Sequence, residues 1–245
     1  MPGTSMAEGL RRVAEAGPFF AVRTAEAPGE EPRAHGYVPF AELCADPGPL
    51  RARITTVAGR LGTDELRVGA SLVFQGLAAR LWSLALGSAV LAGTLPDLSP
   101  ERLWWHPDRS APDELWLPGP VSAADGPVSA ADPGTSADRL RAAVVDGHLV
   151  PLHRAVRSVC PVSGQLLWGN AGSALFGSYR VLRDGCRARG RAEAADTASA
   201  LVRELFREPP LHGTGTLAGG GFTRRSCCLY YRVPGGGLCG DCALA

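Results

Sequence analysis

Hydrophobic positions recur at helical spacing through most of the chain, which predicts a largely helical protein. The longest such run covers residues 64–95, where five large apolar residues lie near one stripe with small residues between them: Leu72, Leu77, Leu81, Leu84 and Val90. A helix of this kind can pack against neighbours on more than one side. A second helical stretch, residues 40–61, is interrupted by the Asp-Pro-Gly-Pro sequence at residues 46–49, because proline and glycine do not continue a helix readily.

The second half of the chain shows further helical patterns. Residues 137–146 and 148–159 are expected to be helical and to be joined or broken at Gly147 and Pro151. Each of these two residue types weakens or interrupts a helix interior.

Two longer helices are expected after this region. Ser163 is a suitable N-cap for a helix that runs to about residue 184, and one face of that helix carries Leu167, Ala171, Leu175, Tyr179 and Leu182. Residues 191–207 are amphipathic as well, and two prolines at positions 209 and 210 end that pattern.

Strand signals are few and short. Residues 19–23 have the composition of a strand, and residues 103–106 and 114–117 could pair as a hairpin across the turn-rich segment 107–112. The balance of elements predicts an α+β fold with a mostly helical body and a small antiparallel sheet.

A linker interrupts the helical pattern. Residues 118–138 contain a perfect tandem repeat, Gly-Pro-Val-Ser-Ala-Ala-Asp at 119–125 and again at 126–132, which is typical of a flexible loop rather than of a solenoid. Residues 211–221 are rich in glycine and are expected to be flexible. The sequence therefore divides into a body at residues 1–210 and a C-terminal segment at residues 211–245.

Membrane insertion and secretion are not expected. The apolar run at residues 68–95 is long enough to span a bilayer, but Arg80 lies near its middle, where insertion costs roughly 2.5–3.5 kcal/mol. A buried core helix is the preferred interpretation. The first residues contain no secretory-signal pattern, so the protein is expected to be cytoplasmic.

Charge composition excludes several function classes. The chain has 25 basic and 24 acidic residues, a balance that argues against a nucleic-acid-binding protein. All of the basic residues are arginine, so neither a Schiff-base lysine nor the lysine of a phosphate-binding loop is available. The glycines at residues 213–221 do not lie between a clear strand and a clear helix, and they are not interpreted as a dinucleotide site.

The C-terminus carries the strongest chemical signal in the sequence. Four of the seven cysteines follow the spacing C-C-x10-C-x2-C: Cys227, Cys228, Cys239 and Cys242. In a reducing compartment such a group indicates metal ligands rather than disulfides. Four thiolates suit an iron–sulfur cluster or zinc. The other three, Cys44, Cys160 and Cys186, are interpreted as small core residues.

The adjacent pair of cysteines favours the iron–sulfur interpretation. Neighbouring side chains in an extended backbone point to opposite sides, which suits one compact tetrahedral zinc poorly. Structural zinc sites usually have two C-x2–4-C turns, and this segment has one. Zinc and a structural or redox role for the thiols remain as alternatives.

The cysteine spacing resembles the C-terminal signature of the FhuF-like ferric-siderophore reductases, which holds a 2Fe-2S cluster. The stretch Leu-Leu-Trp-Gly-Asn-Ala-Gly-Ser-Ala-Leu at residues 166–175 is also similar to a helix that this family shares with siderophore synthetases of the IucA/IucC type. Residues 67–82 have a family-like pattern too. The resemblance covers most of the chain from about residue 60.

The resemblance implies a function and its partners. It implies a 2Fe-2S cofactor on the four C-terminal cysteines and an oxidoreductase that reduces Fe(III) held by a hydroxamate-type siderophore by one electron, so that Fe(II) is released. No flavin or nicotinamide fingerprint is present, so a ferredoxin or a flavoprotein reductase is expected to supply the electron. The alternatives are a non-catalytic 2Fe-2S electron carrier and a siderophore-binding protein with structural zinc.

Five further residues are candidates for contact with the substrate or a partner. Arg224, Arg225 and Arg232 form a basic group next to the cysteines, which could attract an acidic ferredoxin or contact siderophore oxygens; the alternative is plain surface charge or charge that balances the cluster. Trp168 and Asn170 could line a substrate pocket, but a buried aromatic ring beside a hydrogen-bonded amide is the simpler interpretation.

Overall fold

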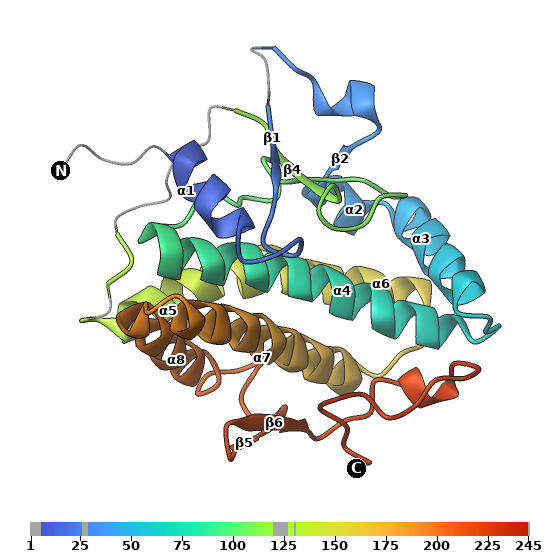
Figure 1. The fold of residues 1–245 in the computed structure, drawn as a ribbon. Helices are drawn as coiled ribbons and strands as arrows, with labels where there is room; N and C mark the ends of the chain where they lie inside the picture. Colours follow the sequence, from blue (N-terminus) through green and yellow to red (C-terminus); the bar gives the residue numbers. More distant parts are fainter. Residues whose placement is uncertain (1–5, 26–28, 120–126, 130, 245) are drawn as a thin grey trace.

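Two long helices, α4 (Leu66–Gly87) and α7 (Gly164–Ala188), pack against each other at the centre of the protein. The computed structural model describes residues 6–25, 29–119, 127–129 and 131–244. Figure 1 shows the small sheet on one side of this helix pair and the C-terminal segment on the other side. The prediction of an α+β fold with a mostly helical body is confirmed.

The remaining helices surround the central pair. They are α1 (Met6–Ala14), α2 (Phe40–Ala45), α3 (Pro47–Arg60), α5 (Pro133–Arg141), α6 (Val150–Val159) and α8 (Ala192–Leu205), with short 3-10 turns η1 (Pro32–His35) and η4 (Tyr230–Arg232). The expected interruption at residues 46–49 is the junction of α2 and α3, where the carboxylate of Asp46 accepts a hydrogen bond from the amide of Gly48 at 2.8 Å. Prolines are tolerated there because the first turn of a helix has no internal amide bonds to lose.

Two stretches of π-helix extend the helical body. The first, η2 (Ser88–Ala92), continues α4 up to Gly93, which ends the helix with a φ of 70°. The second, η3 (Ala142–Leu149), joins α5 to α6. Of the two outcomes expected at Gly147 and Pro151, a join or a break, the structure shows the join, because the wider turn carries the chain through without an interruption.

The principal sheet has four short strands in the order β1-β4-β3-β2. The expected hairpin is present, since β3 (Trp104–Trp105) pairs antiparallel with β4 (Leu115–Leu117). Strand β2 (Val38–Pro39) pairs antiparallel with β3, whereas β1 (Arg23–Thr24) pairs parallel with β4. The sheet is therefore mixed rather than wholly antiparallel. Of the strand expected at residues 19–23, only Arg23 lies in a strand, because residues 18–20 form a turn.

The last residues of the linker and the glycine-rich segment are more ordered than expected. Helix α5 begins inside the predicted linker, with Asp132 as its N-cap, while residues 120–126 and 130 of that linker lie outside the described residues. The predicted flexible segment forms half of a hairpin, β5 (Gly215–Ala218) with β6 (Gly221–Arg224). Gly219 and Gly220 form its turn with φ values of 58° and 75°, a conformation that glycine adopts without strain.

Helix α4 is the core helix that its apolar sequence predicts. The helical stretch Leu66–Ala92 is long and apolar enough to cross a membrane, yet 78% of its most apolar window is buried inside the protein. Arg80 is itself buried, where it donates hydrogen bonds to the carbonyls of Pro18, Phe19, Ala21 and Pro112 and lies 3.7 Å from the carboxylate of Glu114. This arginine thus fastens the N-terminal loop across the helix.

His148 on η3 is fully buried. One of its ring nitrogens lies 2.5 Å from the carbonyl oxygen of Leu98, and its ring packs edge-on against Phe40. Burial lowers the pKa of His148 to about 4, against a smaller opposing effect of the Leu98 hydrogen bond. The folded protein therefore holds this ring neutral at pH values where the unfolded chain is protonated.

Stability is expected to fall as the pH decreases from about 6.5 to about 4. The unfolded state takes up a proton on His148 in this range and the folded state does not, so the loss is on the order of 3 kcal/mol. Denaturant unfolding at pH 7 and pH 4.5 measures it. His148→Gln should have a lower free energy of unfolding than wild type at pH 7, but that free energy should fall less between pH 7 and pH 4.5. An equal fall in wild type and variant would contradict the assignment.

Candidate metal centre

The four C-terminal cysteines lie on residues 224–244, which are called the cluster segment below. The segment leaves strand β6, passes through the short turn η4 and then runs without regular structure to its end. In Figure 1 it lies against the N-terminal halves of α4 and α7. Two helices that are far apart in the sequence therefore form the platform for all four thiols.

The cysteines occur as two pairs with similar surroundings. In each pair one thiol is buried (Cys228, 3% exposed; Cys242, 5% exposed) and the other is partly exposed (Cys227 and Cys239). The second pair closes a tight turn in which the amide of Cys242 donates to the carbonyl of Cys239 at 3.1 Å. After the first pair, Leu229 redirects the chain with a left-handed φ of 68°.

Backbone amides point at two of the sulfurs. The amide of Leu229 donates to the Sγ of Cys227 at 3.3 Å, and the amide of Leu244 donates to the Sγ of Cys242 at 3.3 Å. Each donor lies two residues after its cysteine, so the turn geometry itself supplies the bond. Such bonds stabilise negative charge on a thiolate and raise the reduction potential of a bound cluster.

Arg224 supplies a buried positive charge at the same site. Its side chain is 2% exposed, its Nη1 lies 4.0 Å from the Sγ of Cys239, and its Nη2 donates to the Oδ1 of Asn170. Its Nε has no hydrogen-bond partner, and among the described residues this guanidinium forms no ion pair with an acidic side chain. A buried cation without a carboxylate needs another source of negative charge.

The donor set and its surroundings fit a 2Fe-2S cluster. Four thiolates with two amide donors and an uncompensated guanidinium suit a group that carries net negative charge. Within the described ranges no three His, Cys, Asp or Glu side chains gather around one point as ligands of a single ion. A two-iron cluster takes four thiolates in all, and the segment contains four cysteines.

A chain of hydrogen bonds links the cluster segment to both central helices. Asn170 on α7 donates through Nδ2 to the carbonyl and the hydroxyl of Ser71 on α4, at 2.8 and 2.9 Å. Ser71 in turn donates to the carbonyl of Cys228 at 2.6 Å. With Arg224, these residues connect the first cysteine pair to the second through the helix interface. Asn170 is fully buried, so it positions neighbouring groups instead of lining an open pocket.

The C-terminal residues pack against the part of α7 that carries the motif at residues 166–175. A Cβ at Gly169 would lie 2.1 Å from the hydroxyl of Ser226, and one at Gly172 would lie 2.6 Å from that of Thr214. A larger residue at either position would displace the side chain that packs there, so glycine suits both positions. One turn further, the hydroxyl of Ser173 donates to the carboxylate of Asp241.

Sequence reasoning found Asn170 of this motif but missed its partner Ser71 and the separate hydrogen bond between Ser173 and Asp241. Polar residues within two otherwise apolar helices were the available signal.

Trp168 and Arg225 line a cavity of about 370 Å³ beside the first cysteine pair, together with Gln165, Pro210, His212, Gly213, Thr214 and Ser226. The indole ring of Trp168 stacks on the imidazole of His153 with ring centroids 4.9 Å apart. Arg225 is exposed. These two candidates therefore share one surface, whereas Arg224 lies beneath it.

Arg232 occupies a third position. Its Nε lies 2.7 Å from the carboxylate of Glu65, the residue immediately before α4. The hydrogen bond from Arg232, together with one from Arg67, lowers the pKa of Glu65. This ion pair ties the loop between the two cysteine pairs to the central helix, and it leaves the aromatic rings of Tyr230 and Tyr231 exposed beside it.

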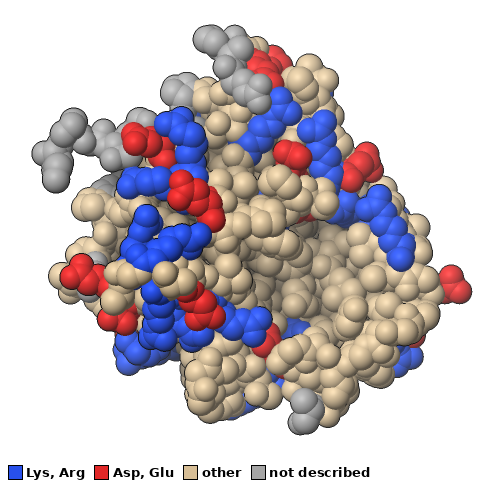
Figure 2. Space-filling model, viewed as in Figure 1, with Lys and Arg blue, Asp and Glu red and all other residues tan. Residues whose placement is uncertain are grey.

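A second cavity of about 390 Å³ lies between α4 and α7 and is called the interhelix cavity below. Its walls are Ala16, Gly17, Pro18, Phe19, Phe20, Gln75, Ala79, Ser83, Ser173, Ala174, Gly177, Ser178, Arg180, Val181 and Asp241. Figure 2 shows a hollow near the centre of this face, lined mainly by uncharged atoms. Through Asp241 the cavity borders the turn that carries Cys239 and Cys242.

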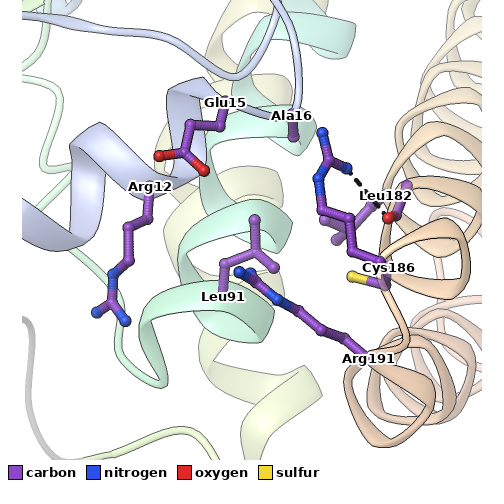
Figure 3. Close-up of a pocket in the computed structure, with 9 residues that line it drawn as sticks. Arg12, Glu15, Ala16, Leu91, Leu182, Cys186 and Arg191 are labelled. Carbon is purple, nitrogen blue, oxygen red and sulfur yellow. Dashed lines mark hydrogen bonds between the residues drawn. The ribbon is translucent and has the colours of Figure 1, made fainter.

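The remaining cysteines are separate from this site. Cys160 and Cys186 are buried, Cys44 is half-buried, and burial raises the pKa of each thiol. Figure 3 shows Cys186 near the C-terminal end of α7, in a small cavity of about 20 Å³ with Leu91 and Arg191. That volume holds about one water molecule, so this cavity offers no room for a substrate.

Two comparisons with known proteins agree with this site. Residues 224–244 match the family model described as the FhuF 2Fe-2S C-terminal domain. The chain is also similar to the ferric siderophore reductase of Escherichia coli strain K12, with 31% identity over 100 residues. The aligned part covers 39% of this chain and 37% of that protein, so the similarity spans little more than a third of either.

The fold and the site define an iron–sulfur protein whose cofactor is a 2Fe-2S cluster. The cluster segment matches the FhuF-type 2Fe-2S domain, and the resemblance to FhuF-like proteins predicted from the cysteine spacing is confirmed.

Proposed function

We propose that this protein is an iron–sulfur oxidoreductase that reduces Fe(III) bound to a siderophore, and that its substrates are hydroxamate-type chelates. The observation that carries the proposal is the match of residues 224–244 to the FhuF 2Fe-2S domain. The similarity to a protein named ferric siderophore reductase supports it. Cys227, Cys228, Cys239 and Cys242 are the proposed cluster ligands.

The proposed reaction is the transfer of one electron. An external donor supplies the electron, chelated Fe(III) becomes Fe(II), and no bond within the siderophore is broken. Iron leaves because hard oxygen ligands hold Fe(II) more weakly than Fe(III). When bound, a 2Fe-2S cluster stores and delivers one electron at a time. Arg224 and the amides of Leu229 and Leu244 stabilise the negative charge that accompanies this role.

The electron donor is proposed to dock on the exposed face of the cluster segment. Four exposed large apolar side chains lie within this short stretch: Tyr230, Tyr231, Leu238 and Leu244. Arg225 and Arg232 are exposed beside them. Apolar and basic groups together suit a small acidic electron carrier, either a ferredoxin or a flavoprotein reductase. The three cysteines outside the segment are free thiols, which agrees with a reducing compartment, and the cytoplasm is the proposed location.

A cavity beside the cluster segment favours a reductase over a simple electron carrier. A carrier needs only a path for electrons, whereas a reductase needs room for a substrate near the cluster. Both the interhelix cavity and the cavity at Trp168 border the cluster segment.

Anaerobic mixing of the dithionite-reduced protein with ferrioxamine tests the proposal. The visible spectrum of the oxidised cluster should return, and one Fe(II) per protein should be trapped by ferrozine. A carrier alone would be reoxidised by cytochrome c but not by the chelate. A colourless protein with stoichiometric zinc would contradict the proposal outright.

A further inference from the structure

The interhelix cavity has the composition of a ligand site. Its walls are mostly apolar or small, and Phe19 and Val181 remain 44% and 48% exposed at its edge. Three serine hydroxyls and one carboxamide stand among them, at Ser83, Ser173, Ser178 and Gln75. Apolar walls with a few convergent polar groups are typical of sites for small organic molecules.

One wall atom is left without a partner. The Oε1 of Gln75 is buried and accepts no hydrogen bond within the described part of the chain. Leaving such an oxygen unpaired costs about 1–3 kcal/mol. A ligand with an N–H or O–H group in the cavity would satisfy it.

The charges of the cavity select among iron chelates. Among the described residues that line it, only Arg180 and Asp241 carry charge, and they are of opposite sign. Three hydroxamates, with one negative charge each, form a neutral complex with Fe(III), whereas three catecholates leave a trianion. A trianion needs several cations to replace its water, so this cavity suits the neutral complex.

The position of the cavity brings its occupant to the cluster segment. Asp241 lies between Cys239 and Cys242 in sequence and contributes to the wall, and its carboxylate accepts a hydrogen bond from Ser173 on α7. The arrangement thus places the ligand against the turn that carries the second cysteine pair. The exposed face of the segment, with Tyr230 and Leu238, stays free for the donor.

We infer that the interhelix cavity is the binding site for an uncharged ferric tris-hydroxamate, with the carboxamide of Gln75 as its hydrogen-bonding group; this inference rests on the proposed function. The cavity volume of about 390 Å³ is within the usual range for ligand pockets. Its opening beside Phe19 allows part of a larger chelate to remain in solvent.

Gly177→Leu tests the inference with little disturbance of the fold. Gly177 lines the cavity, and a Cβ added there meets no atom within 4 Å. Leucine also has a higher helix propensity than glycine, so the variant should fold and fill the cavity. Gly59→Leu on α3 is the matched control, because a Cβ there also meets open space and Gly59 lines neither cavity.

The measurement is calorimetric binding of gallium(III) ferrioxamine E to the cluster-loaded protein. Gallium has the charge and size of Fe(III) but is not reduced, so binding is read without activity. We expect wild type and Gly59→Leu to bind equally, Gly177→Leu to bind at least tenfold more weakly, and Gln75→Met to bind several-fold more weakly. The trianionic gallium complex of enterobactin should bind wild type at least tenfold more weakly than the neutral one.

The outcomes separate the cavity from the proposed function. Unchanged binding in Gly177→Leu overturns the cavity as the site, and so does wild type that reduces ferrioxamine E without binding its gallium analogue. If Trp168→Ala lost binding while Gly177→Leu kept it, the substrate would lie in the cavity at Trp168 and not in the interhelix cavity. Failure of the wild type to reduce any ferric siderophore contradicts the proposed function, whatever the gallium titrations show.

Discussion

Cys239→Ser is expected to abolish the cluster. A serine hydroxyl is a far poorer ligand for iron than a thiolate, and the tight turn from Cys239 to Cys242 offers no other sulfur to replace it. We expect iron and acid-labile sulfide to fall to about a tenth of the wild-type content or less, with loss of visible absorption and of the EPR signal of the reduced protein.

Cys44→Ser is the matched control for this experiment. Cys44 lies on α2, outside the cluster segment, and burial raises the pKa of its thiol to about 12, so the thiol stays protonated. This variant should keep full iron and sulfide. A Cys239→Ser protein that retained both, after anaerobic purification and reconstitution, would refute the assignment of that ligand.

Arg224→Gln is expected to lower the reduction potential of the cluster by on the order of 100 mV. The guanidinium is buried 4.0 Å from the Sγ of Cys239, and one unit charge at such a distance contributes about 4 kcal/mol at an intermediate effective dielectric. Reduction adds negative charge, so removal of the cation disfavours the reduced form. An EPR-monitored redox titration measures the shift.

Arg225→Gln makes the same charge change on the surface. Arg225 is exposed, and solvent and salt screen its charge, so its variant should shift the potential by only about a fifth as much. If the reduction potential shifted equally in the two variants, the effect of Arg224 would not come from its buried charge next to Cys239. Arg224→Gln should also unfold at lower denaturant, because Asn170 loses its donor.

Local order in the C-terminal region was harder to predict than the helices. Glycines at residues 213–221 indicated flexibility, yet the hairpin forms because Phe222 packs against Phe176 and Phe206. Those contacts join residues far apart in the chain. Likewise, the basic group at Arg224, Arg225 and Arg232 is one cluster in sequence but three environments in space: one buried, one exposed and one paired with Glu65.

The sequence by itself indicated a site with four thiolate ligands, the helical body and the central apolar helix, and the 2Fe-2S type followed from the family resemblance. Cysteine spacing and hydrophobic periodicity are local properties, and local spacing limits which metal and which element can form. Only the tertiary structure decided what surrounds the cysteines. Asn170, Ser71 and Arg224 meet because α4 and α7 pack side by side beneath the cluster segment. The interhelix cavity arises from the same packing, which joins residues that are 95 to 99 positions apart in the sequence.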